Sequence, residues 1–202
     1  MMKEIITKAR ENSKKRNFNQ SFDLIINLKD VESIDFFIEM KHPVKENKIC
    51  AFVGSELYDD AKKYCHEAIH SDDFAKQDVK KLAKEYDLFI GQANIMPLIA
   101  STFGRVLGRL GKMPSPKAGS IVPPNANLKN VVERLSKTLR IRTAGGSVIR
   151  TIVGKEDMDD SKIEENINWI LDQLMHHLPN GKENIKSIIL KTTMGKGVKW
   201  QI

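Results

Sequence analysis

Hydrophobic and polar side chains alternate in two early segments of the chain, Phe22 to Leu28 and Phe36 to Met40, as they do in strands with one buried face. Pro43 ends the second segment, because proline cannot donate the backbone hydrogen bond that a strand interior needs. Residues 1–16 precede both segments and carry isoleucine and alanine on one side of a helix. The N-terminal region therefore predicts one helix followed by two strands.

The pattern changes at Ile49–Val53, a continuous apolar run that is typical of a strand buried on both faces. After it, we expect a helix at residues 78–85, a strand at 87–90, a helix that begins at Ile95 and another helix at 128–137. Because strands and helices alternate here, the middle of the chain predicts a small parallel α/β domain.

Strand-like alternation returns in residues 141–153, and a strongly amphipathic helix follows. Ser161-Lys162-Ile163-Glu164 matches a capping box and predicts the first turn of that helix, and Pro179-Asn180-Gly181 predicts its end. Two further strand-like runs, residues 188–191 and 198–202, close the chain.

Both ends of the chain show the same alternating pattern with one helix each, whereas the middle does not. We therefore predict two domains. Residues 1–46 and 140–202 form a discontinuous α+β domain with an antiparallel sheet, and residues 47–139 form an inserted, Rossmann-like α/β domain of three layers. The two connections between the domains lie together and form a hinge.

The composition is that of a globular protein, since 41% of its 202 residues are hydrophobic, and the formal net charge at pH 7 is +7. Basic residues gather in three clusters, within residues 8–16, 105–117 and 182–199. A polyanionic partner fits these clusters, although any one of them alone is more simply interpreted as a solvated surface.

The N-terminal residues lack the apolar core of a signal peptide, and no run of 18 apolar residues is present. Two cysteines, Cys50 and Cys65, are too few for a disulfide scaffold and fit a reducing compartment. These features predict a cytoplasmic protein that does not span a membrane.

His66-Glu67-Ala68-Ile69-His70 matches the zinc-protease pattern HExxH. On a helix, both histidines would bind one zinc ion and Glu67 would activate a zinc-bound water. No third ligand follows at a recognised spacing, however, and the segment is expected at the surface near the end of a helix. A zinc-dependent hydrolase that uses His66, Glu67 and His70 is therefore kept as the alternative function.

Other enzyme motifs fail on single positions. A phosphate-binding loop that ends in Gly111-Lys112 needs glycine at 106 and serine or threonine at 113, where the chain has valine and methionine. After Ile49–Val53 only Gly54 stands where a dinucleotide fingerprint needs three glycines. We therefore expect no cofactor, no bound metal and no enzymatic activity.

Thr193-Met194-Gly195 lies in a basic, glycine-containing turn between the last two strands. A hydroxyl group, a polarizable side chain and an accessible backbone together suit a splayed-out nucleotide of RNA. An ordinary glycine turn of a hairpin is the alternative interpretation.

Three segments, in this order, resemble the ribosomal protein L-one family of the large-subunit side stalk, and its archaeal members above all. They are residues 16–22 (RNFNQSF), residues 107–117 (LGRLGKMPSPK) and Thr193–Gly195 (TMG). The second segment departs from the usual LGPRGKMPxP at Arg109-Leu110, and Lys196-Gly197 follows TMG where proline is usual.

The resemblance implies a structural constituent of the large ribosomal subunit that binds large-subunit rRNA at the mobile side stalk. It also implies that the protein assists release of deacylated tRNA from the exit site, represses translation of its own mRNA, and is monomeric when free of the ribosome. By position, it implies RNA contacts at Phe22, Ser187, Thr193, Met194 and Gly195. The alternation of side chains equally favours Phe22 as a core residue, whereas it places Ser187 on the face that would be bound.

Overall fold

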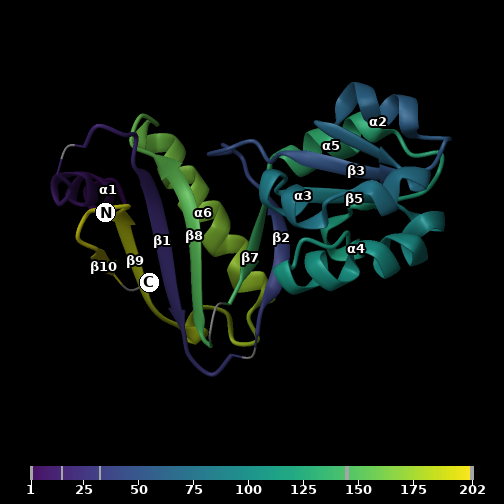
Figure 1. The fold of residues 1–202 in the computed structure, drawn as a ribbon. Helices are drawn as coiled ribbons and strands as arrows, with labels where there is room; N and C mark the ends of the chain where they lie inside the picture. The colour runs from purple at the N-terminus through teal and green to yellow at the C-terminus, as the bar shows by residue number, and fades with distance from the viewer. Residues whose placement is uncertain (1, 15, 32, 144–145, 201–202) are drawn as a thin grey trace. The chain divides into compact units, whose positions relative to one another are not determined.

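The chain divides into two compact units, of which the first comprises Met1–Val44 with Leu139–Ile202 and the second comprises Lys45–Thr138. The structure, a computed structural model, describes residues 2–14, 16–31, 33–143 and 146–200 (Figure 1). Its first unit contains an antiparallel sheet and its second unit a parallel sheet, so the predicted mixed fold class is confirmed.

The first unit is a four-stranded antiparallel sheet with two helices packed on one face. In chain order its elements are α1 (Met2–Glu11), β1 (Ser21–Leu28), β2 (Asp35–Glu39), β7 (Thr138–Arg142), β8 (Val148–Lys155), α6 (Asp160–His177), β9 (Ile185–Thr192) and β10 (Val198–Trp200). The sheet has the order β10-β9-β1-β8, and β2 pairs with β7 in a separate two-stranded sheet. The central strand thus comes from the N-terminal part of the chain, and both of its neighbours come from the C-terminal part.

The alternating pattern that predicted β1 divides its residues between the two faces of the sheet. Phe22, Leu24, Ile26 and Leu28 are buried against α1 and α6, whereas the residues between them are half-buried on the other face. We call this other face, to which Asp23 belongs, the open face of the sheet.

The second unit is a parallel sheet covered by helices on both faces. Its elements are β3 (Ile49–Val53), α2 (Tyr58–Tyr64), β4 (Glu67–His70), α3 (Val79–Glu85), β5 (Leu88–Gln92), α4 (Met96–Leu110), β6 (Ile121–Val122) and α5 (Leu128–Ser136). The strand order is β4-β3-β5-β6, and every residue of β3 is buried, as its continuous apolar run predicts. Among the described residues, no helix has the length and apolar character needed to cross a membrane.

Two predicted helix boundaries are wrong. The first helix ends at Glu11 instead of residue 16. The last helix, α6, begins at Asp160 with Asp159 as its N-cap, so the predicted capping box, which starts at Ser161, does not cap the helix. At the start of α6, the Arg10 guanidinium binds the Asp160 carboxylate at 2.7 Å, a long-range contact that a short sequence window does not contain. Lys15 and Ile202, assigned above to the first basic cluster and the last strand, lie outside the described residues.

A buried asparagine ties α6 to the strands of the first unit. Asn166 Oδ1 accepts a hydrogen bond from the His42 backbone N–H at 3.1 Å, and Asn166 Nδ2 donates to the carbonyls of His42 at 2.7 Å and Val153 at 2.9 Å. The side chain is fully buried, so these three backbone groups depend on it for their partners.

We expect Asn166→Ala to lower the free energy of unfolding of the first unit by about 2–4 kcal/mol, because it leaves buried backbone groups unpaired. Urea unfolding followed by tryptophan fluorescence measures this loss, since Trp169 and Trp200 both lie in the first unit. The control is Asn17→Ala at an exposed position, which should change the free energy by less than about 0.5 kcal/mol. Equal stability of the two variants would contradict the role given to Asn166.

Candidate nucleic-acid interface

The turn between β9 and β10 is held against the start of β1 by hydrogen bonds. The Thr193 N–H donates to the Ser21 carbonyl at 3.0 Å, and the Ser21 N–H donates to Thr193 Oγ1 at 3.1 Å. The Gly195 N–H closes the turn on the Thr192 carbonyl at 3.1 Å. Thr193, Met194 and Gly195 are therefore in one ordered turn at the edge of the sheet.

Gln20 is a buried polar side chain that connects this turn to two other segments. Its Oε1 accepts a hydrogen bond from the Met194 N–H at 3.2 Å, and its Nε2 donates to Ser13 Oγ at 2.8 Å. Its backbone carbonyl accepts from the Glu156 N–H at 2.8 Å. The turn, the segment after α1 and the end of β8 thus share one residue, so the turn has a defined backbone conformation.

Met194 itself is exposed, with a relative solvent accessibility of 59% for the residue. Phe18, two residues before Gln20, is 52% exposed and is the aromatic side chain that this segment presents to solvent. Exposed apolar side chains are suited to stacking on unpaired bases. Phe18 was not predicted as an RNA contact; the sequence signal for it is that Phe18 precedes the alternating strand and so is not assigned to the core.

Phe22 and Ser187 are differently placed from the turn residues. The Phe22 ring is fully buried in the core, with the Arg10 guanidinium 5.1 Å from its centroid. This burial agrees with the core interpretation that the alternation allowed, and an RNA contact at Phe22 stays a prediction. Ser187 lies on the open face as predicted, but it is buried and its Oγ accepts a hydrogen bond from Asn27 Nδ2 at 2.9 Å.

Gly195 and Gly197 are required by packing within the chain. A Cβ on Gly195 would lie 2.2 Å from Thr192 Oγ1, and a Cβ on Gly197 would lie 2.6 Å from Ile189 Cγ2. Gly195 was expected to let a ligand approach the backbone. In the structure Gly195 also allows the turn to pack, because the fully buried Thr192 side chain occupies the space that a Cβ on Gly195 would need.

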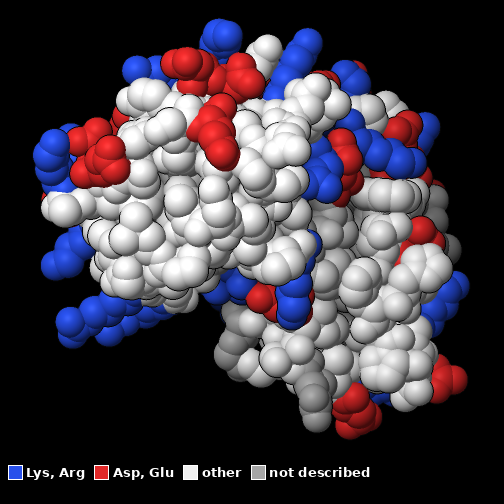
Figure 2. Space-filling model, turned by 90° about the vertical axis from the view of Figure 1, so that its right-hand side faces the viewer, with Lys and Arg blue, Asp and Glu red and all other residues white. Residues whose placement is uncertain are grey.

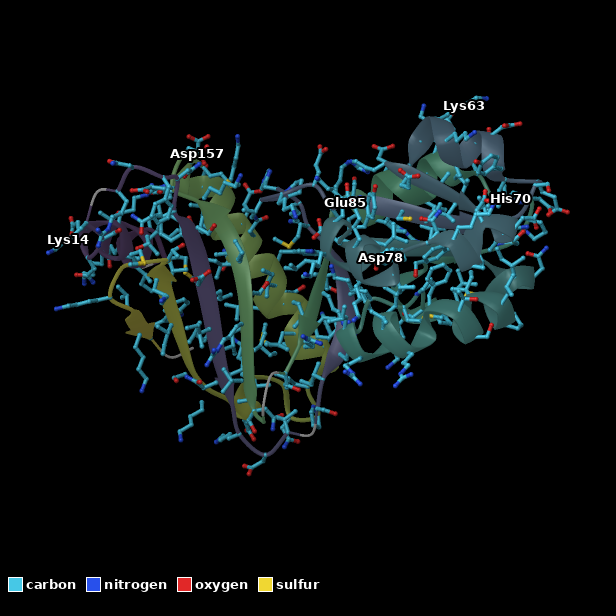
Figure 3. The ribbon with its side chains drawn as sticks, viewed as in Figure 1. Lys14, Lys63, His70, Asp78, Glu85 and Asp157 are labelled. Atoms are coloured by element: carbon cyan, nitrogen blue, oxygen red, sulfur yellow. The ribbon has the colours of Figure 1, made fainter. Side chains whose placement is uncertain are left out.

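The first and last basic clusters meet around this turn. Gly195 lies against Ser13, and Lys14 and Arg16 are exposed in the segment that follows. Figure 3 shows Lys14 beside α1. From the other cluster, Lys196 and Lys199 are exposed. Exposed basic residues from both ends of the chain therefore belong to the segments that meet at the turn.

The middle basic cluster belongs to the second unit. Arg105 and Arg109 of α4, with Lys80 of α3, line a hollow of about 560 Å³. Lys112, in contrast, donates to the carbonyls of Ala83 at 2.9 Å and Tyr86 at 2.6 Å, so it closes the C-terminal end of α3 and is a structural residue.

The HExxH segment does not form a zinc site, because it is a strand and not a helix. Residues 67–70 form β4, and strands rise about 3.3 Å per residue, which places His66 and His70 far apart. Their ring nitrogens are also engaged: His66 Nδ1 accepts from the Ile49 N–H at 3.2 Å, and His70 Nε2 lies 3.0 Å from Ser55 Oγ. Within the described part of the chain, no three His, Cys, Asp or Glu side chains gather as metal ligands.

Ser55, His70 and Asp72 form a group that resembles a hydrolase triad in composition. His70 Nδ1 is 3.4 Å from the Asp72 carboxylate, but it also accepts a hydrogen bond from the Asp72 backbone N–H at 3.3 Å. An accepting Nδ1 leaves the proton of the neutral ring on Nε2, which faces Ser55. A serine nucleophile needs the opposite tautomer, so this group does not supply a general base.

The ligand-binding edge of the parallel sheet is filled by the protein itself. In open α/β folds, ligands bind at the carboxyl ends of the strands where the strand order reverses, here between β3 and β5. The buried side chain of Gln92 accepts from the Gly54 N–H at 2.7 Å and donates to Glu56 at 2.9 Å. Figure 2 faces the end of this unit at which Figure 3 labels His70, and few charged side chains cover its centre.

The two cysteines are not reactive thiols. Burial raises the pKa of Cys50 far above its ordinary value, and burial raises the pKa of Cys65 to about 11. Both side chains therefore remain protonated at neutral pH, which removes the nucleophilic thiolate form.

Comparison with known proteins identifies relatives along almost the whole chain. Residues 8–196 match the family model described as the ribosomal protein L1p/L10e family. The large ribosomal subunit protein uL1 of Nanoarchaeum equitans is 39% identical, over 96% of this chain and 96% of its own. The proteins of that name from Thermococcus kodakarensis and Methanothermococcus thermolithotrophicus are 36% and 39% identical, over 97% and 94% of this chain and 94% and 92% of their own.

We expect Gly195→Ala to destabilise the first unit by about 1–3 kcal/mol, because the added Cβ overlaps the buried Thr192 hydroxyl. Urea unfolding monitored by tryptophan fluorescence measures the effect. In the control, Gly108→Ala, the added Cβ meets no atom within 4 Å, so the tryptophan transition should not move. An unchanged transition in Gly195→Ala would show that the turn is looser than described.

Proposed function

Because the chain belongs to the ribosomal protein L1p/L10e family, we propose that it binds large-subunit ribosomal RNA at the mobile side stalk through the first unit. The family membership makes it a ribosomal protein of the large subunit, with a structural role on the cytoplasmic ribosome.

The observation that carries the proposal is an ordered turn that exposes Met194, with exposed Lys196 after it and exposed Lys14 in a segment that Gln20 also contacts. Lysines and arginines bring the protein onto phosphates without regard to sequence, whereas exposed apolar side chains on a fixed backbone select an RNA shape with unpaired bases. Since Gln20 and Ser21 fix the backbone of the turn, little conformational entropy is lost on binding. Met194 and Phe18 then stack on bases, and Thr193 and Gly195 contact riboses.

The two units have separate tasks in this proposal. Residues 1–46 and 140–202 form the RNA-binding domain, because both basic ends of the chain meet there. Residues 47–139 form the second domain. The chain passes between the two domains twice, so two connecting segments join them. Such a pair of connections lets the second domain change its orientation while the first stays on the RNA.

We propose two further roles for the protein, repression of its own translation and assistance in the release of deacylated tRNA. A messenger RNA that reproduces the shape of the rRNA site would bind to the same turn, and so the protein would repress its own translation. Assistance in the release of deacylated tRNA from the exit site would follow from its place on the side stalk. When it is free of the ribosome we propose that it is a monomer.

We expect Met194→Asp to weaken binding to the side-stalk rRNA fragment at least about tenfold. The substitution removes one stacking contact, of about 1–3 kcal/mol, and adds a negative charge beside phosphate. Filter binding at a fixed salt concentration measures the change. Lys129→Ala is the control, because Lys129 is an exposed lysine of α5 in the second unit and should change the affinity less than twofold. Equal losses in the two variants would refute the division of tasks between the units.

We also expect Lys196→Ala to reduce the slope of log affinity against log salt concentration by about one unit, since it removes one phosphate contact. The same filter-binding assay at three or more salt concentrations gives the slope. Lys129→Ala again serves as the control and should leave the slope unchanged. A slope that stays constant in Lys196→Ala would remove this lysine from the interface.

A further inference from the structure

The open face of the antiparallel sheet contains a hollow of about 320 Å³, beyond the turn described above. Six residues line it: Asp23 and Ile25 of β1, Arg150, Thr151 and Ile152 of β8, and Lys191 of β9. Its volume is at the lower end of the range of about 300–1,000 Å³ for small-molecule sites, so it suits a single planar ring system.

Asp23 is the carboxylate at the centre of this hollow. In the register of the sheet it lies between Lys191 on β9 and Ile152 on β8. Burial raises the pKa of Asp23 and the nearby Lys191 ammonium opposes this, while no described residue gives the carboxylate a hydrogen bond. Two acceptor oxygens are thus partly withdrawn from water without a donor from the protein.

The walls of the hollow combine two isoleucines with a basic residue from each strand that flanks β1. Ile152 is 44% exposed, and Ile25 is half-buried beside it, so both offer surface to the face of a ring. Arg150 lies opposite Ile25 on β8 and is exposed. Lys191 Nζ donates to the Thr193 carbonyl at 3.3 Å, so one residue that lines the hollow also contacts the turn.

We propose that this hollow binds one unstacked guanine of the RNA, with the Asp23 carboxylate as the acceptor for its Watson–Crick edge. Guanine has two adjacent donors there, the N1–H and the 2-amino group, which match the two oxygens of a carboxylate. Uracil has one donor between two carbonyl oxygens, and these oxygens repel a carboxylate. Ile25 and Ile152 contact the face of the base, and Arg150 and Lys191 bind the flanking phosphates.

This inference rests on the proposed RNA-binding function and adds a base preference to it. A bare basic surface would bind any RNA equally, because phosphate contacts carry no sequence information. An acidic residue between basic residues lowers the affinity of the surface for phosphate. Hydrogen bonds that its carboxylate accepts from a base offset this loss. Asp23 is therefore assigned to specificity, while Met194 and the lysines supply most of the affinity.

The experiment measures fluorescence anisotropy of labelled RNA hexamers, UUGUUU, UUIUUU with inosine, and UUUUUU, on the full chain. The wild type should bind UUGUUU at least about fivefold more tightly than UUUUUU, the lower end of what a bidentate base contact gives. Inosine lacks the 2-amino group and should fall between them. Asp23→Asn should bring the ratio close to one, because the amide presents a donor where guanine also presents donors.

Asp157→Asn is the matched control, because it removes the same charge from an exposed carboxylate of the same unit, labelled in Figure 3. It should keep the full preference for UUGUUU. Thermal unfolding of both variants checks that each is folded. We expect Asp23→Asn to fold, because Asp23 is half-buried and asparagine has nearly the same shape.

A wild type without preference, or an Asp23→Asn variant that keeps it, would overturn the guanine assignment. If Met194→Asp still weakened binding to the side-stalk fragment, the proposed function would survive that result. Competition by free guanosine monophosphate as strong as by UUGUUU would also overturn the assignment, because the hollow would then be a nucleotide site and not an RNA contact.

Discussion

The pairing of β1 with β9 is the contact on which the rest of the first unit depends. It places an N-terminal strand at the centre of a sheet whose other strands come from the last third of the chain. Seven residue pairs, from Phe22↔Thr192 to Leu28↔Ile185, hold the register. A slip by one residue would move the apolar side chains of β1 from the core to the open face, so burial enforces this register. The turn after β9 is consequently fixed beside the segment that precedes β1.

That juxtaposition gives a local turn its chemical character. Alone, Thr193–Gly195 would be a flexible link in a hairpin with a three-residue final strand. In the fold, Gln20 Oε1 accepts a hydrogen bond from the Met194 N–H, and Gln20 Nε2 donates one to Ser13 Oγ. The turn is therefore bound to a residue 174 positions away in the sequence. Hydrogen bonds to a buried side chain restrict the backbone while Met194 stays in solvent. The turn is rigid, has an exposed apolar side chain and lies near lysine and arginine side chains. We therefore expect it to bind a folded RNA more tightly than it binds a flexible polyanion.

The sequence predicted this site unevenly, and the reasons are physical. Strands with one buried face are evident from alternation, so β1, β2 and β8 were located well, and the continuous run at Ile49–Val53 identified the fully buried β3. The HExxH segment was placed on a helix, but residues 67–70 form the strand β4. So short a segment has too little periodicity to distinguish helix from strand, and here the pairing with β3 makes it a strand. Phe22 was ambiguous for the opposite reason, since an aromatic residue at the start of a strand serves core and ligand equally until burial is known.

By itself, the sequence determined the division into an antiparallel end-built unit and a parallel inserted unit, the excess of positive charge, and the motif that indicates the family. These properties are local or additive, so they can be obtained from short windows and from sums of charge. The tertiary structure alone decided which side chains are exposed, that Phe18 and not Phe22 faces solvent, that Lys112 is structural, and that Asp23, Arg150 and Lys191 enclose one hollow. Those properties depend on contacts between residues that are distant in sequence, from 26 positions for Lys112 and Tyr86 to 174 for Gln20 and Met194, and such contacts have no signature in a short window.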